Sequence, residues 1–221
     1  MSDDLRTSTP ERTSSFVASL AEPAGRAATA SAYTPARCGD TPLERLCDTL
    51  DAILAAGAKC PESSRSAFFA RSMRSALAKA AAQADLLEPA QREGAAERYR
   101  RHLLAADPLG RYAIAALVWQ PGQRSPVHAH HTWCGYAVLE GQLSETVYDW
   151  NHAQDRASPL RSRARKRGAV SFVGSGRGAI HQLGNSSDAP AVSLHVYGVE
   201  GARIGTGVND IVRVAESSAL V

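Results

Sequence analysis

The sequence predicts a mainly β protein, in which an antiparallel β-barrel follows a set of α-helices. Apolar residues repeat with helical spacing only in the first half of the chain. From Arg111 onward, short runs rich in Val, Ile, Tyr and Trp alternate with turns that contain Gly, Pro, Asn and Asp. Many short strands at this spacing are typical of an antiparallel sandwich or barrel.

Length, composition and charge indicate a globular domain. The 221 residues have room for one domain with a helical appendage, and 44% hydrophobic with 21% charged residues is typical of a folded chain. The net charge of +3 is too small to indicate nucleic acid, and no apolar run approaches the roughly 20 residues of a membrane span. We expect a monomer that binds neither nucleic acid nor membrane.

The N-terminus and the cysteines favour a cytoplasmic protein. Asp3, Asp4 and Glu11, without an apolar segment beside them, argue against a signal peptide. The four cysteines have no CxxC spacing, which argues against a zinc knuckle and against a disulfide framework. Reduced cysteines are typical of the cytoplasm.

We divide the chain into a segment over 1–38, which we expect to be disordered, and a domain over 39–221. The segment is rich in Ser, Thr, Ala, Pro and Arg and has little periodicity. Within the domain we expect a helical layer over 41–104 and the β-barrel over 111–215.

The helical layer begins at residues 41–44, Thr-Pro-Leu-Glu, which combine a capping hydroxyl, proline at the first helical position and an early glutamate. A helical repeat follows and stops at Gly57. Pro89 either ends the second helix or opens a third over 89–104. We interpret the apolar helix faces as packing surfaces. The second helix has such a face with Phe69, Met73, Leu77, Ala80, Ala84 and Leu87.

A basic segment, residues 161–167, lies between two expected strands and carries five positive charges in seven residues. Such a charge density could contact phosphates, but no aromatic residue interleaves with it to stack on bases. We therefore favour a solvated loop. The expected strands are 112–119, 125–131, 133–140, 143–150, 169–173, 179–183, 191–197 and 211–215.

Two histidines, His128 and His130, are the most informative feature of the chain. Alternate side chains of a strand point to the same face, so both imidazoles enter one space. Burying them without a ligand would cost free energy, because polar groups would be left unsatisfied. Two convergent imidazoles are half of a metal site.

The spacing Gly122-x5-His128-x-His130-x3-Cys134-x6-Gly141 resembles the first motif of the cupin superfamily, except that Cys134 stands in place of glutamate. Residues 178–185 resemble the second motif and contain His181. The resemblance implies a double-stranded β-helix and a metal held by His128, His130 and His181. Three neutral imidazoles suit iron(II) with dioxygen and suit zinc with hydroxide, so these ligands leave the metal open.

Further segments resemble the cysteine dioxygenase family of thiol dioxygenases. Residues 191–197 resemble its Ser-x-His-x-Tyr strand, and residues 125–130 and 139–146 are also similar to it. Ala129 departs from the family's aspartate between the two ligands, on the face away from the metal. The resemblance implies iron(II), and a relay in which Ser193 orients His195 and His195 orients Tyr197. Tyr197 then donates a hydrogen bond beside the substrate.

Residues 99–104, with Tyr99 and Arg101, resemble the family segment that binds the substrate carboxylate. Arginine grips a carboxylate with two hydrogen bonds, which glutamine cannot do. Family members with glutamine there act on 3-mercaptopropionate and carry a second arginine after the Tyr strand. In this chain that place is near Asn209 and Asp210, with Arg203 and Arg213 on either side.

In some thiol dioxygenases, the cysteine at this position is covalently bonded to the tyrosine of the Ser-x-His-x-Tyr strand. The resemblance therefore makes a covalent bond between Cys134 and Tyr197 one of two alternatives. A buried cysteine beside the metal is the equal alternative. We expect His131, His102 and His152 to be surface residues.

Taken together, these features predict an iron(II)-dependent dioxygenase of a small thiol carboxylate, with L-cysteine converted to cysteine sulfinic acid. The alternatives are a dioxygenase of 3-mercaptopropionate or mercaptosuccinate, and a non-enzymatic metal-binding cupin sensor that acts through the basic segment.

Overall fold

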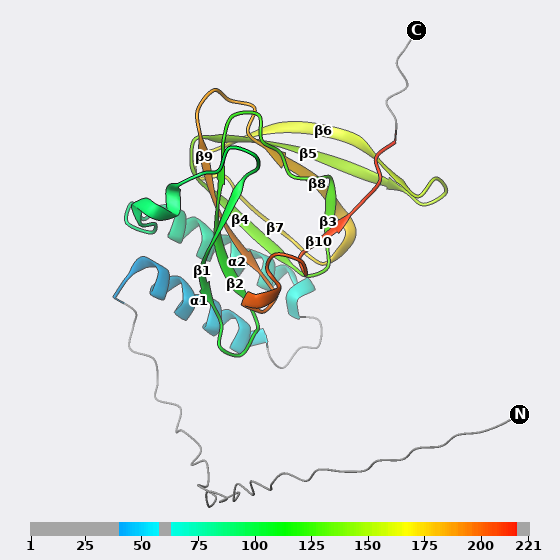
Figure 1. Ribbon diagram of the computed structural model, residues 1–221. Coiled ribbons are helices and arrows are strands. Elements are labelled where there is room, and N and C mark those ends of the chain that lie inside the picture. The colour runs from blue at the N-terminus through cyan, green and yellow to red at the C-terminus, as the bar shows by residue number, and fades with distance from the viewer. Residues whose placement is uncertain (1–39, 58–62, 216–221) are drawn as a thin grey trace, which may run out of the picture. The chain divides into compact units, whose positions relative to one another are not determined.

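The computed structural model describes residues 40–57 and 63–215, so the expectation for residues 1–38 lies outside the described part (Figure 1). No helix within that part is long and apolar enough to cross a membrane. The helices are α1 (Pro42–Gly57) and α2 (Ala67–Ala81). The strands are β1 (Arg100–Ala106), β2 (Ala113–Trp119), β3 (His128–His130), β4 (Cys134–Glu140), β5 (Gln142–Asn151), β6 (Arg156–Lys166), β7 (Val170–Val173), β8 (Gly176–Gly184), β9 (Ala191–Tyr197) and β10 (Asn209–Ile211).

The start of α1 is a capping box. The Glu44 backbone N–H donates to Thr41 Oγ1 at 3.2 Å, and the Thr41 N–H donates to the Glu44 carboxylate at 2.9 Å. The second helix, α2, has its N-cap at Ser66 and ends at Ala81. The expected second helix therefore runs too far, since Ala84 and Leu87 lie beyond its end.

The expected third helix over 89–104 is wrong. Pro89–Arg92 forms one 3-10 turn, and the residues from Arg100 belong to β1, which pairs antiparallel with β2. Arg, Leu and Ala are good helix formers, but pairing with the buried β2 decides the conformation of this segment. The helical layer consequently ends before residue 100, and the sheet begins earlier than residue 111.

Two five-stranded antiparallel sheets form the body of the domain, in the orders β1-β2-β9-β4-β7 and β10-β3-β8-β5-β6. Figure 1 shows the two sheets facing one another. They are not hydrogen-bonded into a closed barrel in the described part of the chain. The mainly β cupin class with N-terminal helices is confirmed.

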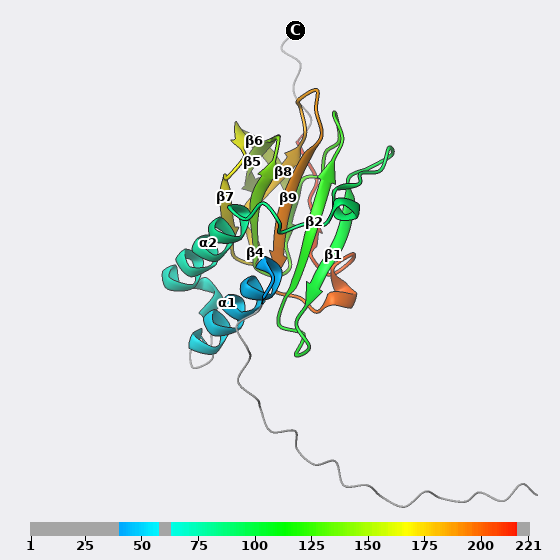
Figure 2. The same cartoon turned by 90° about the vertical axis from the view of Figure 1, so that its left-hand side faces the viewer.

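Strand alternation sorts the side chains of the first sheet between two cores. Leu194 and Val196 of β9 pack with the apolar faces of α1 and α2, which cover the outer side of this sheet (Figure 2). The intervening Ser193, His195 and Tyr197 face the space between the sheets, where His195 and Tyr197 line a pocket. The second sheet supplies the opposite wall of that pocket.

The basic segment 161–167 is not a loop, because its residues up to Lys166 belong to β6. This strand lies at the edge of its sheet, and its paired neighbour is β5. Edge strands commonly carry charges, which oppose pairing with other chains. Two of its arginines, Arg163 and Arg165, also contact a buried carboxylate, as described next.

Candidate metal centre

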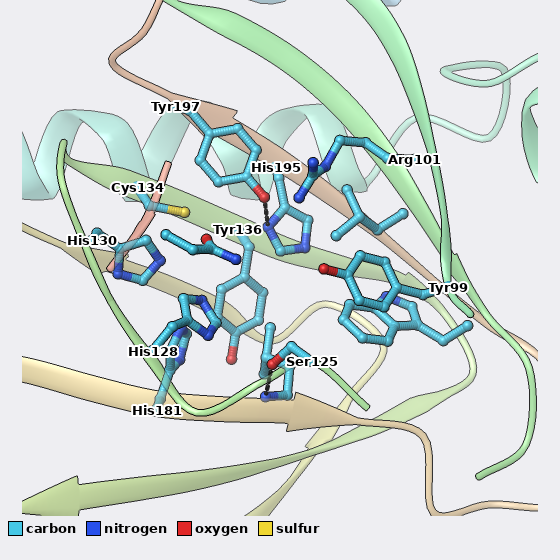
Figure 3. A pocket seen from close by; sticks show the side chains of 14 residues that line it. Tyr99, Arg101, Ser125, His128, His130, Cys134, Tyr136, His181, His195 and Tyr197 are labelled. Carbon is cyan, nitrogen blue, oxygen red and sulfur yellow. Dashed lines mark hydrogen bonds between the residues drawn. The ribbon is translucent and has the colours of Figure 1, made fainter. Parts of the chain in front are cut away.

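Three buried histidines meet between the two sheets. His128 and His130 come from β3, and His181 comes from β8, where it is the register partner of His128. Their candidate ligand atoms all lie within 4.8 Å of one another, and the side chains converge in Figure 3. His128 and His130 thus share a face through their spacing on β3, and the third histidine, His181, comes from the neighbouring strand β8.

The state of these imidazoles fits a divalent metal ion. Pro126 O accepts a hydrogen bond from His128 Nδ1 at 2.9 Å, which leaves the Nε2 atom of His128 free. The Nδ1 atom of His130 is buried and has no hydrogen-bond partner in the part of the chain that the structure describes. Burial, followed by the proximity of His181, lowers the pKa of His128 to about 4 and that of His130 to about 2. Both rings are thus neutral near pH 7, which is the form that binds metals.

His181 is oriented by a carboxylate that sequence analysis missed. Glu145 of β5 is 3% exposed, and its Oε1 atom accepts a hydrogen bond from His181 Nδ1 at 3.1 Å. Arg163 donates to Glu145 Oε2 at 2.7 and 2.9 Å, and Arg165 lies 3.7 Å from the same atom. Burial opposes ionisation, but the hydrogen bonds from His181 and Arg163 lower the pKa of Glu145 to about 2. A carboxylate that directs a metal-binding histidine is a common outer partner in metal sites.

Cys134, at the cupin glutamate position, lies in the pocket wall. It is the β4 register partner of Tyr197 on β9, and both side chains are buried. Burial raises the pKa of the Cys134 thiol, so the group stays protonated and offers no anion to a metal. The candidate ligand set in the described part of the chain therefore consists of three histidines, with no carboxylate or thiolate among them.

On β9 the three expected relay residues form a chain of hydrogen bonds. Ser193 Oγ lies 2.9 Å from His195 Nε2, and the Tyr197 hydroxyl lies 3.0 Å from His195 Nδ1. Burial, followed by the charge of Arg101, lowers the pKa of His195 well below its usual value. The ring is therefore neutral and carries one N–H, so the hydrogen bonds have a direction.

Trp119 sets that direction. Its indole N–H, which can only donate, is 2.9 Å from Ser193 Oγ. Among the described residues, the acceptor within reach of the Ser193 hydroxyl hydrogen is His195 Nε2, which favours the tautomer in which His195 carries its proton on Nδ1 and donates to the Tyr197 oxygen. The hydroxyl hydrogen of Tyr197 consequently remains free for a ligand in the pocket.

Arg101 and Tyr99 lie on the same pocket as the three histidines. Arg101 Nη1 donates to Ile204 O at 2.9 Å, while its buried Nε–H has no hydrogen-bond partner among the described residues. The guanidinium carbon is 5.9 Å from the centre of the Tyr197 ring. Tyr99 stacks on Trp119 with ring centres 4.3 Å apart. An unsatisfied buried guanidinium donor favours an anionic ligand.

Residues 92–200 match the model of the family described as cysteine dioxygenase type I. This match supports the cysteine dioxygenase family for the chain. It is 32% identical over 104 residues to cysteine dioxygenase type 1 of Danio rerio and 31% identical over 103 residues to that of Rattus norvegicus. These alignments cover 45% of this chain and 51% and 50% of the relatives. The chain thus spans about half the length of the curated relatives it matches.

Among solved structures, the chain is similar to the protein TT1209 from Thermus thermophilus, with 22% identity and a TM-score of 0.40. That alignment covers 51% of this chain and 96% of the other. The family match includes all the pocket side chains discussed above, from Tyr99 to Tyr197.

The remaining candidate residues from the sequence divide into one that lines this pocket and others that lie outside it. Asn209 lines it, as the β10 partner of His130, whereas Arg203 and Arg213 do not. His131 and His152 are exposed, as expected. His102 is half-buried and bonds to Glu93 O at 2.8 Å. The sequence signal that could have found Glu145 was its place in the family-like segment 139–146.

Proposed function

We propose that this protein is an iron(II)-dependent thiol dioxygenase. The reaction adds both atoms of dioxygen to the sulfur of a small thiol carboxylate, so that RSH and O2 become RSO2H. The observation that carries the proposal is the convergence of three buried histidines, a buried arginine donor and the Tyr197 hydroxyl on one pocket. When bound, iron(II) supplies the redox chemistry that dioxygen and a thiolate require.

The chain's own groups bind and orient the substrate in this proposal. Arg101 binds the carboxylate, and Tyr197 donates its free hydroxyl hydrogen to the reacting end of the substrate. An all-histidine ligand set adds no negative charge, so it would leave the positive charge of the metal ion for an anionic thiolate. Leu117 and Leu183 line the same pocket and exclude water from it.

Oxygen uptake by the iron-loaded protein across a panel of thiols tests this function. L-cysteine is the first candidate from the sequence, followed by 3-mercaptopropionate and mercaptosuccinate. We expect thiol-dependent oxygen uptake with a sulfinic acid as the product, identified by mass spectrometry. Metal binding without uptake for every thiol would favour the sensor instead. In that alternative the exposed Arg161, Lys166 and Arg167 would be the part of the basic segment that acts, because Arg163 and Arg165 contact Glu145.

Trp119→Phe should lower kcat/KM by about tenfold, because losing one buried donor costs roughly 1.5 kcal/mol and lets the relay reverse. In the reversed relay Tyr197 donates to His195 and not to the substrate. The measurement is a double-mutant cycle with Tyr197→Phe. If Trp119 acts through the relay, its replacement has little further effect in the Tyr197→Phe protein. Equal losses in both backgrounds would mean that Trp119 is only a pocket wall.

A thioether between Cys134 and Tyr197 should form during turnover, since the two residues are register partners on adjacent strands and face the same pocket. The bond would join Sγ to a ring carbon, with loss of two hydrogens to dioxygen as the oxidant. Peptide mass spectrometry after incubation with iron and thiol measures it, and Cys134→Ala is the control. Complete alkylation of the Cys134 peptide, with no joined peptide, would leave Cys134 as a pocket wall.

A further inference from the structure

A second hollow adjoins the pocket, and arginines dominate its lining. The two share the lining residues Tyr99, Arg101 and Asn209, so they lie side by side. We call this hollow the arginine vestibule. It is lined by Ala95, Arg98, Tyr99, Arg100, Arg101, Arg124, Pro126, Gly205 and Asn209.

The positive charge of the arginine vestibule is not balanced by the protein. Within residues 40–57 and 63–215, Arg98 and Arg124 form no ion pair, and Arg100 reaches Glu93 only at 3.8 Å with both side chains largely exposed. None of the described residues that line the vestibule or the pocket is Asp or Glu. An anion would be attracted here, whereas a cation would find no partner.

Specific contacts fix the two unpaired arginines relative to one another. Gln123 Nε2 donates to Ala95 O at 2.8 Å and to Ala96 O at 3.1 Å, and so joins the turn before Arg124 to the segment before Arg98. The Gln123 side chain also accepts from the Gln120 N–H at 2.9 Å. Arg124 itself is held by a backbone bridge to Gly184 of β8. The vestibule is thus assembled by the fold and does not depend on independent surface loops.

We propose that the substrate is a small thiol with two carboxylates, and that the vestibule binds the second one through Arg98 and Arg124. This inference rests on the proposed function, in which Arg101 binds the first carboxylate. It also opposes L-cysteine, because the ammonium group of that thiol would meet guanidinium groups and no carboxylate. A second carboxylate at the position of that ammonium group would instead be stabilised by the guanidinium groups.

The experiment compares mercaptosuccinate, which has two carboxylates, with 3-mercaptopropionate and L-cysteine in the iron-loaded protein. Mercaptosuccinate should have the highest kcat/KM. The double variant Arg98→Gln/Arg124→Gln should lower its kcat/KM about tenfold or more, and that of 3-mercaptopropionate by less than about twofold. Arg167→Gln is the matched control, since this exposed arginine lies outside both hollows, and it should change neither value.

Equal losses for both thiols in the double variant, or a higher kcat/KM for L-cysteine than for mercaptosuccinate, would overturn the proposal. A calorimetric titration of the metal-free protein separates it from the proposed function. Succinate should bind more tightly than propionate, and the double variant should remove the difference. If no thiol is oxidised, the proposed function fails and this titration alone decides whether the vestibule binds a second carboxylate. Equal affinities for the two acids would reject it.

Discussion

The His181→Ala variant is expected to lose its metal ion and all measurable dioxygenase activity. A three-histidine site has no spare donor, and the protonated thiol of Cys134 cannot replace an imidazole. Metal analysis of the purified variant, together with oxygen uptake, measures both effects. His128→Ala and His130→Ala should behave in the same way. His152→Ala is the control, because this histidine is exposed and lies outside the pocket.

Glu145→Gln provides a graded version of the same experiment. Its carboxylate orients His181 from behind, so metal affinity should fall by about 10- to 100-fold while the fold is kept. Full metal occupancy in His181→Ala would remove His181 from the ligand set. An unchanged affinity in Glu145→Gln would mean that the contact between Glu145 and His181 does not tune the metal.

Arg101→Gln should raise KM for thiol carboxylates strongly. Losing a charge-assisted, bidentate contact in a partly dry pocket costs roughly 2–4 kcal/mol, or about 30- to 900-fold in affinity. Steady-state oxygen uptake measures the change. Arg101→Lys should recover only part of the loss, because lysine keeps the charge but lacks the planar fork.

Cysteamine, a thiol without a carboxylate, is the control substrate for the Arg101→Gln variant. Its turnover, however slow, should be the same in the native protein and in Arg101→Gln. If KM for thiol carboxylates is also unchanged, the carboxylate binds elsewhere. The backbone contact of Arg101 with Ile204 would then be a structural one.

Features that depend on local spacing were predictable from the sequence. His128 with His130, and Ser193 with His195 and Tyr197, are each separated by two positions, so strand alternation places each group on one face. The capping box at Thr41 is likewise a property of four neighbouring residues. The fold class and the family also follow from such local patterns.

Only the tertiary structure decided which residues that are distant in sequence contact one another. Residues 100–106 have helix-forming side chains, but pairing with β2 makes them a strand. From the sequence alone, Arg163 would be interpreted as a solvated charge. The pairing of β6 with β5 places it opposite Glu145.

The sequence by itself determined which side chains share a strand face and, through its motifs, the family and the three candidate metal ligands. The tertiary structure decided that Glu145 supports His181, that Trp119 sets the direction of the relay, and that Arg98 and Arg124 meet at one pocket mouth. The physical reason is range: alternation acts between neighbours two residues apart, whereas a buried hydrogen bond or a charged rim requires segments that only folding brings together.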